Sequence, residues 1–217
     1  MHRKLTILEK TGYAVLRNYG GPAIAPAEWE KLEYLNWKSG GDTNFAPLAS
    51  ANGELECRGF WDHGKPDKGG IWTENRQIAP SLARYVENVG GNFGRVRVIK
   101  LNPSGEQEAL RCLHLDDNNR LNPDGEGWVV RSWLELANTA DKTVFILRGD
   151  KNDPATETRI RLHPGTQLVI DTERLWHVVW HPGPEPRYAL ITSWESGPVI
   201  DDWIISQTEP TRLVPTA

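Results

Sequence analysis

Three polar side chains interrupt apolar segments in the second half of the chain, and their types suit a metal ion. His114 and Asp116 flank Leu115. Residues i and i+2 of an extended segment point to the same face, so these two side chains can converge on one point. His177 interrupts the apolar run 175–180 and could supply a third ligand. Two histidines and one carboxylate leave the opposite side of an ion open, which suits iron(II) chemistry with a co-substrate and dioxygen.

Ordinary explanations exist for each of these residues taken singly. A His-x-Asp triplet is common by chance, and a lone histidine in a strand is more often a hydrogen-bonded core residue. Asp117 adjoins Asp116, so the choice of Asp116 rests on the i, i+2 geometry. His181 competes with His177 but precedes a proline at a turn. The joint occurrence of the triplet and His177 in a strand-rich region favours the metal site.

Two arginines could bind an anion near such a site. Arg187 follows His177 by ten residues, just past a proline-rich turn. A short hairpin would place it beside the His177 strand, where a guanidinium could hold a dicarboxylate's far end bidentately. The alternative is a surface arginine at a strand start. Arg131 shares its strand face with Trp133 and Glu135, and points either into a polar pocket or to solvent.

Composition narrows the class of protein. The 217 residues include 25 Lys and Arg against 29 Asp and Glu, a formal net charge of −4 that argues against a nucleic-acid binder. Two cysteines are too few for a disulfide framework or a cysteine-based zinc cluster. No apolar run reaches the 18 or so residues of a membrane span, and the start of the chain lacks a signal-peptide pattern. We therefore expect a cytoplasmic globular protein with no nucleic-acid or membrane partner.

Short strands dominate the sequence from residue 94 onward. Residues 94–101 alternate charged and apolar side chains, the period of a half-buried strand. Further strands are predicted at 128–136, 143–148, 157–162, 167–171, 175–180 and 187–194, separated by Gly-, Pro- and Asn-rich turns. Short strands at nearly even spacing without helices between them indicate a sandwich or barrel.

The first ninety residues give a different pattern. The spacing predicts helices over 26–37 and 80–89, the second opened by Pro80 and closed by Gly90. Residues 38–70 are rich in Gly, Asp, Asn and Pro and indicate a long loop with short strands. One domain over 1–217 is expected: N-terminal helices and loops (1–93) packed outside a β core (94–200), then a C-terminal extension (201–217).

The pattern resembles the iron(II)- and 2-oxoglutarate-dependent dioxygenases, in particular their aspartyl/asparaginyl β-hydroxylase-like branch. The likeness covers residues 94–194 and rests on four segments in chain order. These are the strand and proline turn 95–103, the His114-Leu-Asp116 triplet, the arginine strand 130–136 and the block 165–187. The resemblance implies a mainly β fold, a double-stranded β-helix or distorted jelly roll, with iron bound near one open end.

The same resemblance implies roles for particular residues. His114, Asp116 and His177 would bind Fe(II). Arg187 would hold the far carboxylate of 2-oxoglutarate, and Arg131 would lie near the carboxylate that chelates the metal. An intact carboxylate at Asp116 favours hydroxylation over halogenation, since the family's halogenases lack that ligand.

The branch acts on Asp or Asn residues in peptides, or on free and carrier-bound amino acids. The expected reaction is therefore hydroxylation of an unactivated C–H bond in a small amino-acid-like molecule or an Asp/Asn-type residue, with dioxygen as oxidant. Arg120, Trp133 and Trp176 are candidates for the substrate pocket, although each tryptophan could equally be a core residue.

Two other classes of function fit the same residues. A cupin-like, metal-dependent isomerase or lyase would use the jelly roll without 2-oxoglutarate, and Arg187 would then be structural. A non-catalytic, ligand-binding β-sandwich would bind through its aromatic side chains, and the histidines would be incidental. Metal content separates the sandwich from the two enzymes, and dependence on 2-oxoglutarate separates the enzymes from each other.

Overall fold

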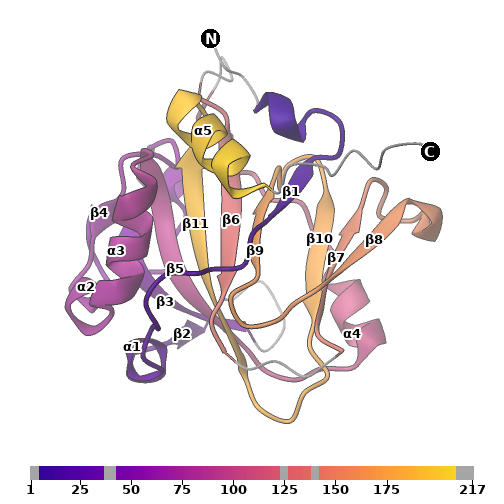
Figure 1. The fold of residues 1–217 in the computed structure, drawn as a ribbon, viewed down its shortest axis with the longest axis horizontal. Coiled ribbons are helices and arrows are strands. Elements are labelled where there is room, and N and C mark those ends of the chain that lie inside the picture. The colour runs from indigo at the N-terminus through magenta and orange to yellow at the C-terminus, as the bar shows by residue number, and fades with distance from the viewer. Residues whose placement is uncertain (1–4, 37–42, 123–126, 138–141, 209–217) are drawn as a thin grey trace, which may run out of the picture.

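Two antiparallel sheets form the centre of the molecule (Figure 1). The computed structural model describes residues 5–36, 43–122, 127–137 and 142–208. Within them, the larger sheet has the strand order β1 (Tyr13–Leu16), β9 (Gln167–Ile170), β6 (Val129–Glu135), β11 (Arg187–Glu195), β5 (Phe93–Leu101), β3 (Thr43–Ser50) and β2 (Leu35–Asn36), with β4 (Ile71–Trp72) paired to β3. The smaller sheet has the order β10 (Trp176–Trp180), β7 (Val144–Arg148) and β8 (Glu157–Arg161).

From β6 onward the chain passes back and forth between the two sheets, with β7 and β8 in the smaller sheet, β9 in the larger, β10 in the smaller and β11 in the larger. From β6 to β7 and from β10 to β11 the chain crosses from one sheet to the other, which is the winding of a double-stranded β-helix. The mainly β jelly roll is therefore confirmed, and each strand expected from 94 to 194 is present within one or two residues of its expected ends.

Helices cover the outer face of the larger sheet. They are α1 (Ala27–Glu30), α2 (Asn75–Ile78), α3 (Pro80–Val89) and α5 (Pro198–Gln207), while α4 (Glu106–Arg111) lies against β10. Pro80 opens α3, where its missing N–H costs nothing, and Gly90 ends it with a positive φ of 74°. The helix expected at 80–89 is confirmed. Short 3-10 helices lie at Thr6–Leu8, Phe60–His63 (η2) and Pro154–Thr156.

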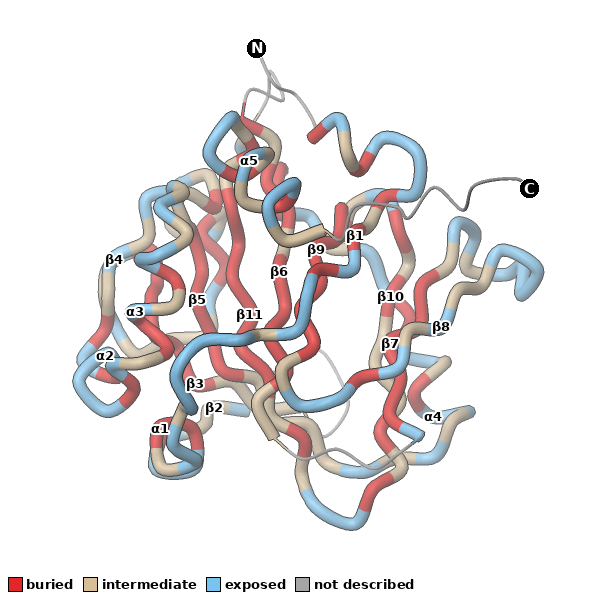
Figure 2. The backbone as a smooth tube through the Cα atoms, in the orientation of Figure 1, coloured by how far each residue is buried: buried red, intermediate tan, exposed pale blue. Residues whose placement is uncertain are grey.

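Buried side chains form two apolar cores (Figure 2). The first lies between the larger sheet and the helices and includes Leu82 and Val86 of α3 against Val96 and Val98 of β5. The second lies between the two sheets and is built from Trp133, Phe145, Leu147, Leu162, Leu168, Ile170, Leu175, Ala189 and Ile191. The inner core fixes the spacing of the two sheets and packs behind β10, the strand that carries His177.

Two expectations for the N-terminal part need correction. The helix expected at 26–37 is one turn at Ala27–Glu30, after which the chain enters β2. The segment 38–70, expected to be a long loop with short strands, contains the eight-residue strand β3 beside β5, while its first residues, 38–42, lie outside the described part of the chain. Pairing with β5 orders this segment despite its unfavourable composition, because partners distant in sequence outweigh local propensity.

The strand 94–101 differs from its expected half-buried form. Val96 and Val98 face the helices and are fully buried, but Arg95 and Arg97 on the opposite face are only 8% and 7% exposed. That face is the interior of the jelly roll, so β5 is buried on both sides. The two arginines therefore need partners inside the protein, since a buried charge without one is costly.

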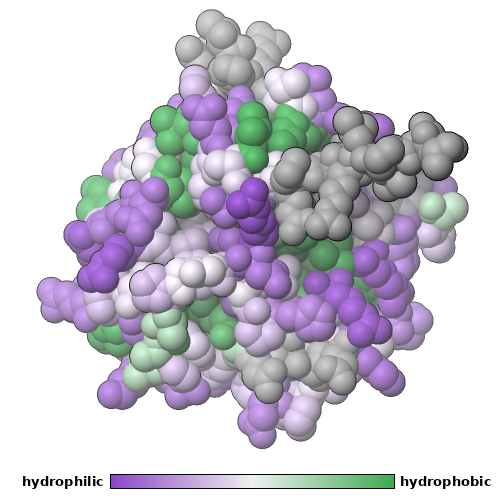
Figure 3. Space-filling view, in the orientation of Figure 1, coloured by the Kyte–Doolittle hydropathy of each residue, from purple (hydrophilic) through white to green (hydrophobic). Residues whose placement is uncertain are grey.

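The surface in the view of Figure 3 is mostly hydrophilic, with hydrophobic side chains near α5. Val199 and Ile205 of α5 are 50% and 59% exposed. Among the described residues, no helix combines the length and apolar character needed to span a bilayer.

Candidate metal centre and arginine pocket

His114, Asp116 and His177 lie together at one end of the barrel. One ligand atom from each lies within 4.8 Å of the other two. Antiparallel backbone bonds join the residues: His177 N–H donates to the His114 carbonyl at 2.9 Å. Asp116 N–H donates to the carbonyl of Thr172, just after β9, at 2.9 Å. The backbone thus fixes all three side chains beside the edge of the smaller sheet, and the expected grouping of these residues is present.

Backbone carbonyls orient both imidazole rings. Nδ1 of His114 lies 2.9 Å from the Cys112 carbonyl, and Nδ1 of His177 lies 3.1 Å from the Leu175 carbonyl. A carbonyl only accepts, so each Nδ1 carries the proton and donates, and a neutral ring keeps its lone pair on Nε2. Those Nε2 atoms each lie 3.8 Å from an oxygen of Asp116. Carbonyl groups that hold the Nδ1 side of a histidine in this way leave its Nε2 atom free to bind a metal.

The two histidines differ in exposure. The His177 side chain is 5% exposed and packs beside the rings of Trp133 and Phe145, whereas the His114 side chain is 55% exposed. Burial lowers the pKa of His177 to about 4, although Asp116 opposes the shift. The ring is therefore neutral at pH 7, as a metal ligand must be. The centre is closed behind His177 and open on the side of His114.

Arg131 supports the carboxylate ligand. Its Nη1 lies 3.1 Å from Oδ2 of Asp116, and its Nη2 donates to Oδ1 of Asn118 at 2.7 Å. Burial alone would raise the pKa of Asp116, but Arg131, His177 and His114 outweigh it and hold that pKa far below its usual value. Asp116 is therefore ionised. Of the two possibilities for Arg131, the polar pocket is the correct one.

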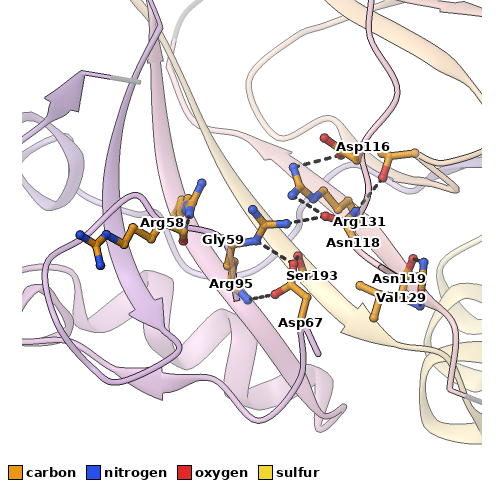
Figure 4. Close-up of polar contacts among 12 residues, drawn as sticks. Arg58, Gly59, Asp67, Arg95, Asp116, Asn118, Asn119, Val129, Arg131 and Ser193 are labelled. Carbon is orange, nitrogen blue, oxygen red and sulfur yellow. Dashed lines mark hydrogen bonds and ion pairs between the residues drawn. The ribbon is translucent and has the colours of Figure 1, made fainter. Parts of the chain in front are cut away.

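A second guanidinium reaches the same amide from β5. Arg95 also donates to Oδ1 of Asn118, and its Nε donates to Oδ2 of Asp67 at 2.7 Å. Asp67 accepts two further bonds, from Arg95 N–H and from the Ser193 hydroxyl. Figure 4 shows Arg95 and Arg131 converging on Asn118 between the two carboxylates. The network links the segment before β4 to the metal-ligand loop through three strands of the larger sheet.

A third guanidinium completes a pocket next to this network. The pocket is lined by Arg95, Arg97, Arg131, Phe45, Ile191 and Ser193. Arg97 donates from Nη2 to the carbonyls of Cys57 and Arg58 at 3.0 Å, and it lies over the Phe45 ring. Burial, followed by repulsion from Arg95, lowers the pKa of Arg97 to about 9. Positive charge is therefore concentrated beside the metal-ligand candidates.

Solved structures share this architecture. One is an oxidoreductase of the 2OG-Fe(II) oxygenase family from Burkholderia pseudomallei, with 15% identity over 87% of this chain and 86% of that one, at a TM-score of 0.53. Another is a prolyl hydroxylase from Trichoplax adhaerens in complex with a hypoxia inducible factor peptide, with 12% identity over 93% and 89% of the chains, at 0.51. The fold is that of the 2OG-Fe(II) oxygenases. No family model and no curated protein matches the sequence.

The donor set of this oxygenase fold fits iron(II). It offers two imidazole nitrogens and one carboxylate, the ligands that non-haem iron oxygenases use, with positions left open. Oδ2 of Asp116 is buried; it forms the ion pair with Arg131 but accepts no hydrogen bond among the described residues. A cation at the centre would satisfy that oxygen.

The fit of 2-oxoglutarate is less direct, because Arg187 already has a carboxylate partner. Arg187 is fully buried, and its Nε and Nη2 donate to Oε2 of Glu135 at 3.0 and 2.7 Å. Burial raises the pKa of Glu135 although Arg187 opposes the shift. Nη1 of Arg187 makes no hydrogen bond among the described residues. The nitrogen Nη1 therefore remains for a ligand carboxylate, while Nε and Nη2 hold the protein's own carboxylate.

The hairpin expected to place Arg187 beside the His177 strand was wrong. β10 lies in the smaller sheet and pairs with β7, whereas β11 lies in the larger sheet between β5 and β6. Arg187 and His177 therefore lie on strands of different sheets and share no sheet edge. Ala189, two residues on, pairs across the strands with Glu135. A small side chain there leaves room for the buried carboxylate.

The three substrate-pocket candidates lie in different places. Trp133 is 5% exposed and packs between Phe145 and the His177 ring, so it is a core residue that also backs the metal centre. Trp176 precedes His177 on β10 and points to the opposite face, where Lys151 lies over its ring. Arg120 is exposed at the rim, stacked on Trp61 of η2. The structure groups only Trp133 with the metal-ligand candidates.

The sequence alone does not indicate that Arg95, Arg97, Asp67 and Asn118 belong to this region. The alternation in 94–101 showed that Arg95 and Arg97 share a face but not that this face is internal. Asp67 lies in a Gly- and Pro-rich loop that gives no periodic signal. Strand alternation does put Glu135 on the same face as Arg131, but it does not predict the ion pair of Glu135 with Arg187.

Proposed function

We propose that the protein is an iron(II)- and 2-oxoglutarate-dependent oxygenase that hydroxylates an unactivated C–H bond. The observation that carries the proposal is the His114, Asp116 and His177 grouping, with both Nε2 atoms directed at the carboxylate and one side open. Iron(II) with 2-oxoglutarate would supply the reductive activation of dioxygen needed to oxidise such a bond.

The chain's own residues would hold and shield this chemistry. Arg131 keeps Asp116 ionised and in place, and the carbonyls of Cys112 and Leu175 keep both rings in the ligating tautomer. Trp133 and Phe145 pack behind His177 and exclude water from that side. A substrate would then approach from the open side at His114.

We further propose that the substrate is a small amino-acid-like molecule or an Asp/Asn-type residue. The arginine pocket beside the metal centre supports an anionic group on the substrate. Arg187 and Arg131 remain the proposed contacts for the two carboxylates of 2-oxoglutarate. For Arg187 this role needs either the Nη1 donor alone or displacement of Glu135.

The first experiment is an anaerobic titration with iron(II) and then 2-oxoglutarate, recording the visible charge-transfer band of the chelate. We expect a band in the wild-type protein and none in His177→Ala. His163→Ala, which changes a histidine outside the grouping, should keep the band. Bound iron without a band would contradict the 2-oxoglutarate site, and absence of iron binding would contradict the whole proposal.

The Arg187–Glu135 pair specifically favours a second candidate. A cupin-like isomerase or lyase would use the same three metal ligands without 2-oxoglutarate, and Arg187 would be structural. A fully buried arginine with a carboxylate partner is what that function predicts. Turnover of a substrate in the absence of 2-oxoglutarate would support the isomerase or lyase over the oxygenase.

A further inference from the structure

The side chain of Asn118 is fixed at both ends of its amide. It is 3% exposed and lies two residues after Asp116, in the loop that carries this metal-ligand candidate. Oδ1 of Asn118 accepts hydrogen bonds from the guanidinium groups of Arg95 and Arg131, the second at 2.7 Å (Figure 4). Nδ2 donates to the hydroxyl of Thr172 at 2.9 Å. Because an amide oxygen only accepts and its nitrogen only donates, these contacts fix which way the amide is turned.

The same contacts connect Asn118 to Asp116 by two routes. One route runs through Arg131, whose Nη1 lies 3.1 Å from Oδ2 of the Asp116 carboxylate. The other runs through Thr172, whose carbonyl accepts the Asp116 N–H at 2.9 Å. Asn118 therefore supports both the carboxylate and the backbone of Asp116, each through one intermediate residue. A shift of the Asn118 amide would disturb both supports at once.

A neutral amide suits this position because the two arginines already have carboxylate partners. Arg95 pairs with Asp67, and Arg131 pairs with Asp116. The amide oxygen of Asn118 accepts from both guanidinium groups but carries no formal charge. It therefore orients Arg131 without competing with Asp116 for the positive charge.

We propose that Asn118 is a positioning residue that presents the Asp116 carboxylate to the metal ion. Its oxygen already accepts two hydrogen bonds and an amide nitrogen has no free lone pair, so Asn118 acts through its neighbours and not as a ligand. Groups that orient a metal ligand in this way typically change metal affinity by about 10- to 100-fold. The inference rests on the metal centre of the proposed function but not on its co-substrate.

Co(II) is the probe, since its visible absorption depends on the number and arrangement of its ligands. The metal-free, full-length protein is titrated with Co(II), and Asp116→Ala gives the spectrum of a centre without the carboxylate. In Asn118→Ala we expect Co(II) to bind about 10- to 100-fold more weakly than in the wild type. The spectrum of the bound ion should shift toward that of Asp116→Ala. Lower stability alone would not change the spectrum of the protein that remains folded.

Asn75→Ala is the matched control. Asn75 lies on α2, is 2% exposed, and donates from Nδ2 to the Pro47 carbonyl at 3.0 Å. The variant therefore removes an equally buried amide from a helix on the outer face of the larger sheet. It should lower the thermal midpoint but keep the Co(II) affinity and spectrum of the wild type.

Thr172→Val provides a second, milder variant. It keeps the size of the side chain and removes the hydroxyl that accepts from Nδ2 of Asn118, while the contacts of Asn118 with the two arginines remain. We expect Co(II) affinity to fall about tenfold, with a spectral shift in the same direction. This variant keeps the test decisive if Asn118→Ala does not fold.

Unchanged Co(II) affinity and spectrum in Asn118→Ala, or in Thr172→Val if the alanine variant does not fold, would overturn the proposal. Equal losses of affinity in Asn118→Ala and Asn75→Ala would also overturn it, because the effect would then follow stability. A wild-type protein that binds no Co(II) would overturn the metal centre and this inference together. Bound metal without the chelate band of 2-oxoglutarate would contradict the co-substrate site alone.

Discussion

Arg187 and Glu135 form an ion pair that is closed off from solvent inside the barrel, with side chains 0% and 1% exposed. Two guanidinium nitrogens donate to the same carboxylate oxygen, Oε2. Nη1 of Arg187 and Oε1 of Glu135 make no hydrogen bond among the described residues. A pair left half-satisfied in this way is expensive to bury, because desolvation offsets much of the attraction. It therefore gives a sensitive way to test what Arg187 does.

Replacing Glu135 by Gln should destabilise the protein and strengthen its binding of 2-oxoglutarate. The buried guanidinium loses its counter-charge, which costs about 3 kcal/mol of unfolding free energy. If Arg187 holds the co-substrate, the incoming carboxylate restores that charge, so 2-oxoglutarate should stabilise the variant more than the wild type. Urea unfolding of Zn(II)-loaded protein with and without 2-oxoglutarate measures both effects.

Glu106→Gln is the control for that experiment. Glu106 pairs with Arg159 at the surface, where the Glu106 side chain is 34% exposed and the Arg159 side chain is 39% exposed. Its loss should cost no more than about 1 kcal/mol, with no change in the response to 2-oxoglutarate. An equal response in Glu135→Gln and the wild type would mean that Arg187 does not contact the co-substrate.

The double variant Arg187→Met, Glu135→Leu should be more stable than either single variant. Removing both charges avoids leaving one buried alone, and apolar replacements of a buried pair are often neutral in stability. A double-mutant cycle on unfolding free energies measures the coupling. The variant then separates folding from binding: a folded protein with unchanged 2-oxoglutarate affinity would make Arg187 purely structural.

Much of the jelly roll could be predicted from the sequence because its strands alternate or run apolar between clear turns. β3 could not, since Asn44 and Pro47 disfavour a strand and the ladder shifts register between Pro47 and Ala49. Pairing with β5 orders it all the same. Trp29 and Leu32 gave the 26–37 segment a helical period, and both are indeed buried, but only the first turn is helical.

His114 and Asp116 could be predicted as neighbours from the sequence, because side chains i and i+2 of an extended segment share a face in any fold. The arginine pocket could not be predicted from the sequence, since an arginine on a strand normally faces water. Arg95 and Arg97 are internal only because β5 lies at the middle of the larger sheet and a distant loop brings Asp67 to meet Arg95. Nothing local to 94–101 encodes that loop.

Gly94→Ala should disturb this loop more than an alanine substitution usually disturbs a strand. A Cβ at Gly94 would lie 2.1 Å from the Asp67 carbonyl oxygen and 2.2 Å from its Oδ1, so the Asp67 backbone would have to move. We expect a loss of about 1–3 kcal/mol in unfolding free energy, as for overpacked sites. Gly20→Ala is the control, because a Cβ there meets no atom within 4 Å. Equal stabilities of the two variants would show that Asp67 can shift freely.

Asp67→Asn should destabilise the protein at neutral pH and lose that effect in acid. Burial would raise the pKa of Asp67, but Arg95, Arg131 and the hydrogen bonds from Arg95 outweigh it, so the pKa lies below its usual value. A carboxyl whose pKa is lowered by folding stabilises the protein above its unfolded pKa of about 3.9, and this contribution disappears as pH falls toward the folded value.

At pH 7 the variant leaves the buried Arg95 without a counter-charge, and we expect a loss of about 3 kcal/mol. Urea unfolding at steps from pH 7 to pH 3 should show a constant difference between the wild type and Asp67→Asn down to about pH 5. Below that the difference should narrow, because only the wild type takes up a proton at residue 67 on unfolding. A difference that stays constant to pH 3 would mean that folding leaves the pKa of Asp67 unchanged, or lowers it too little to stabilise the network.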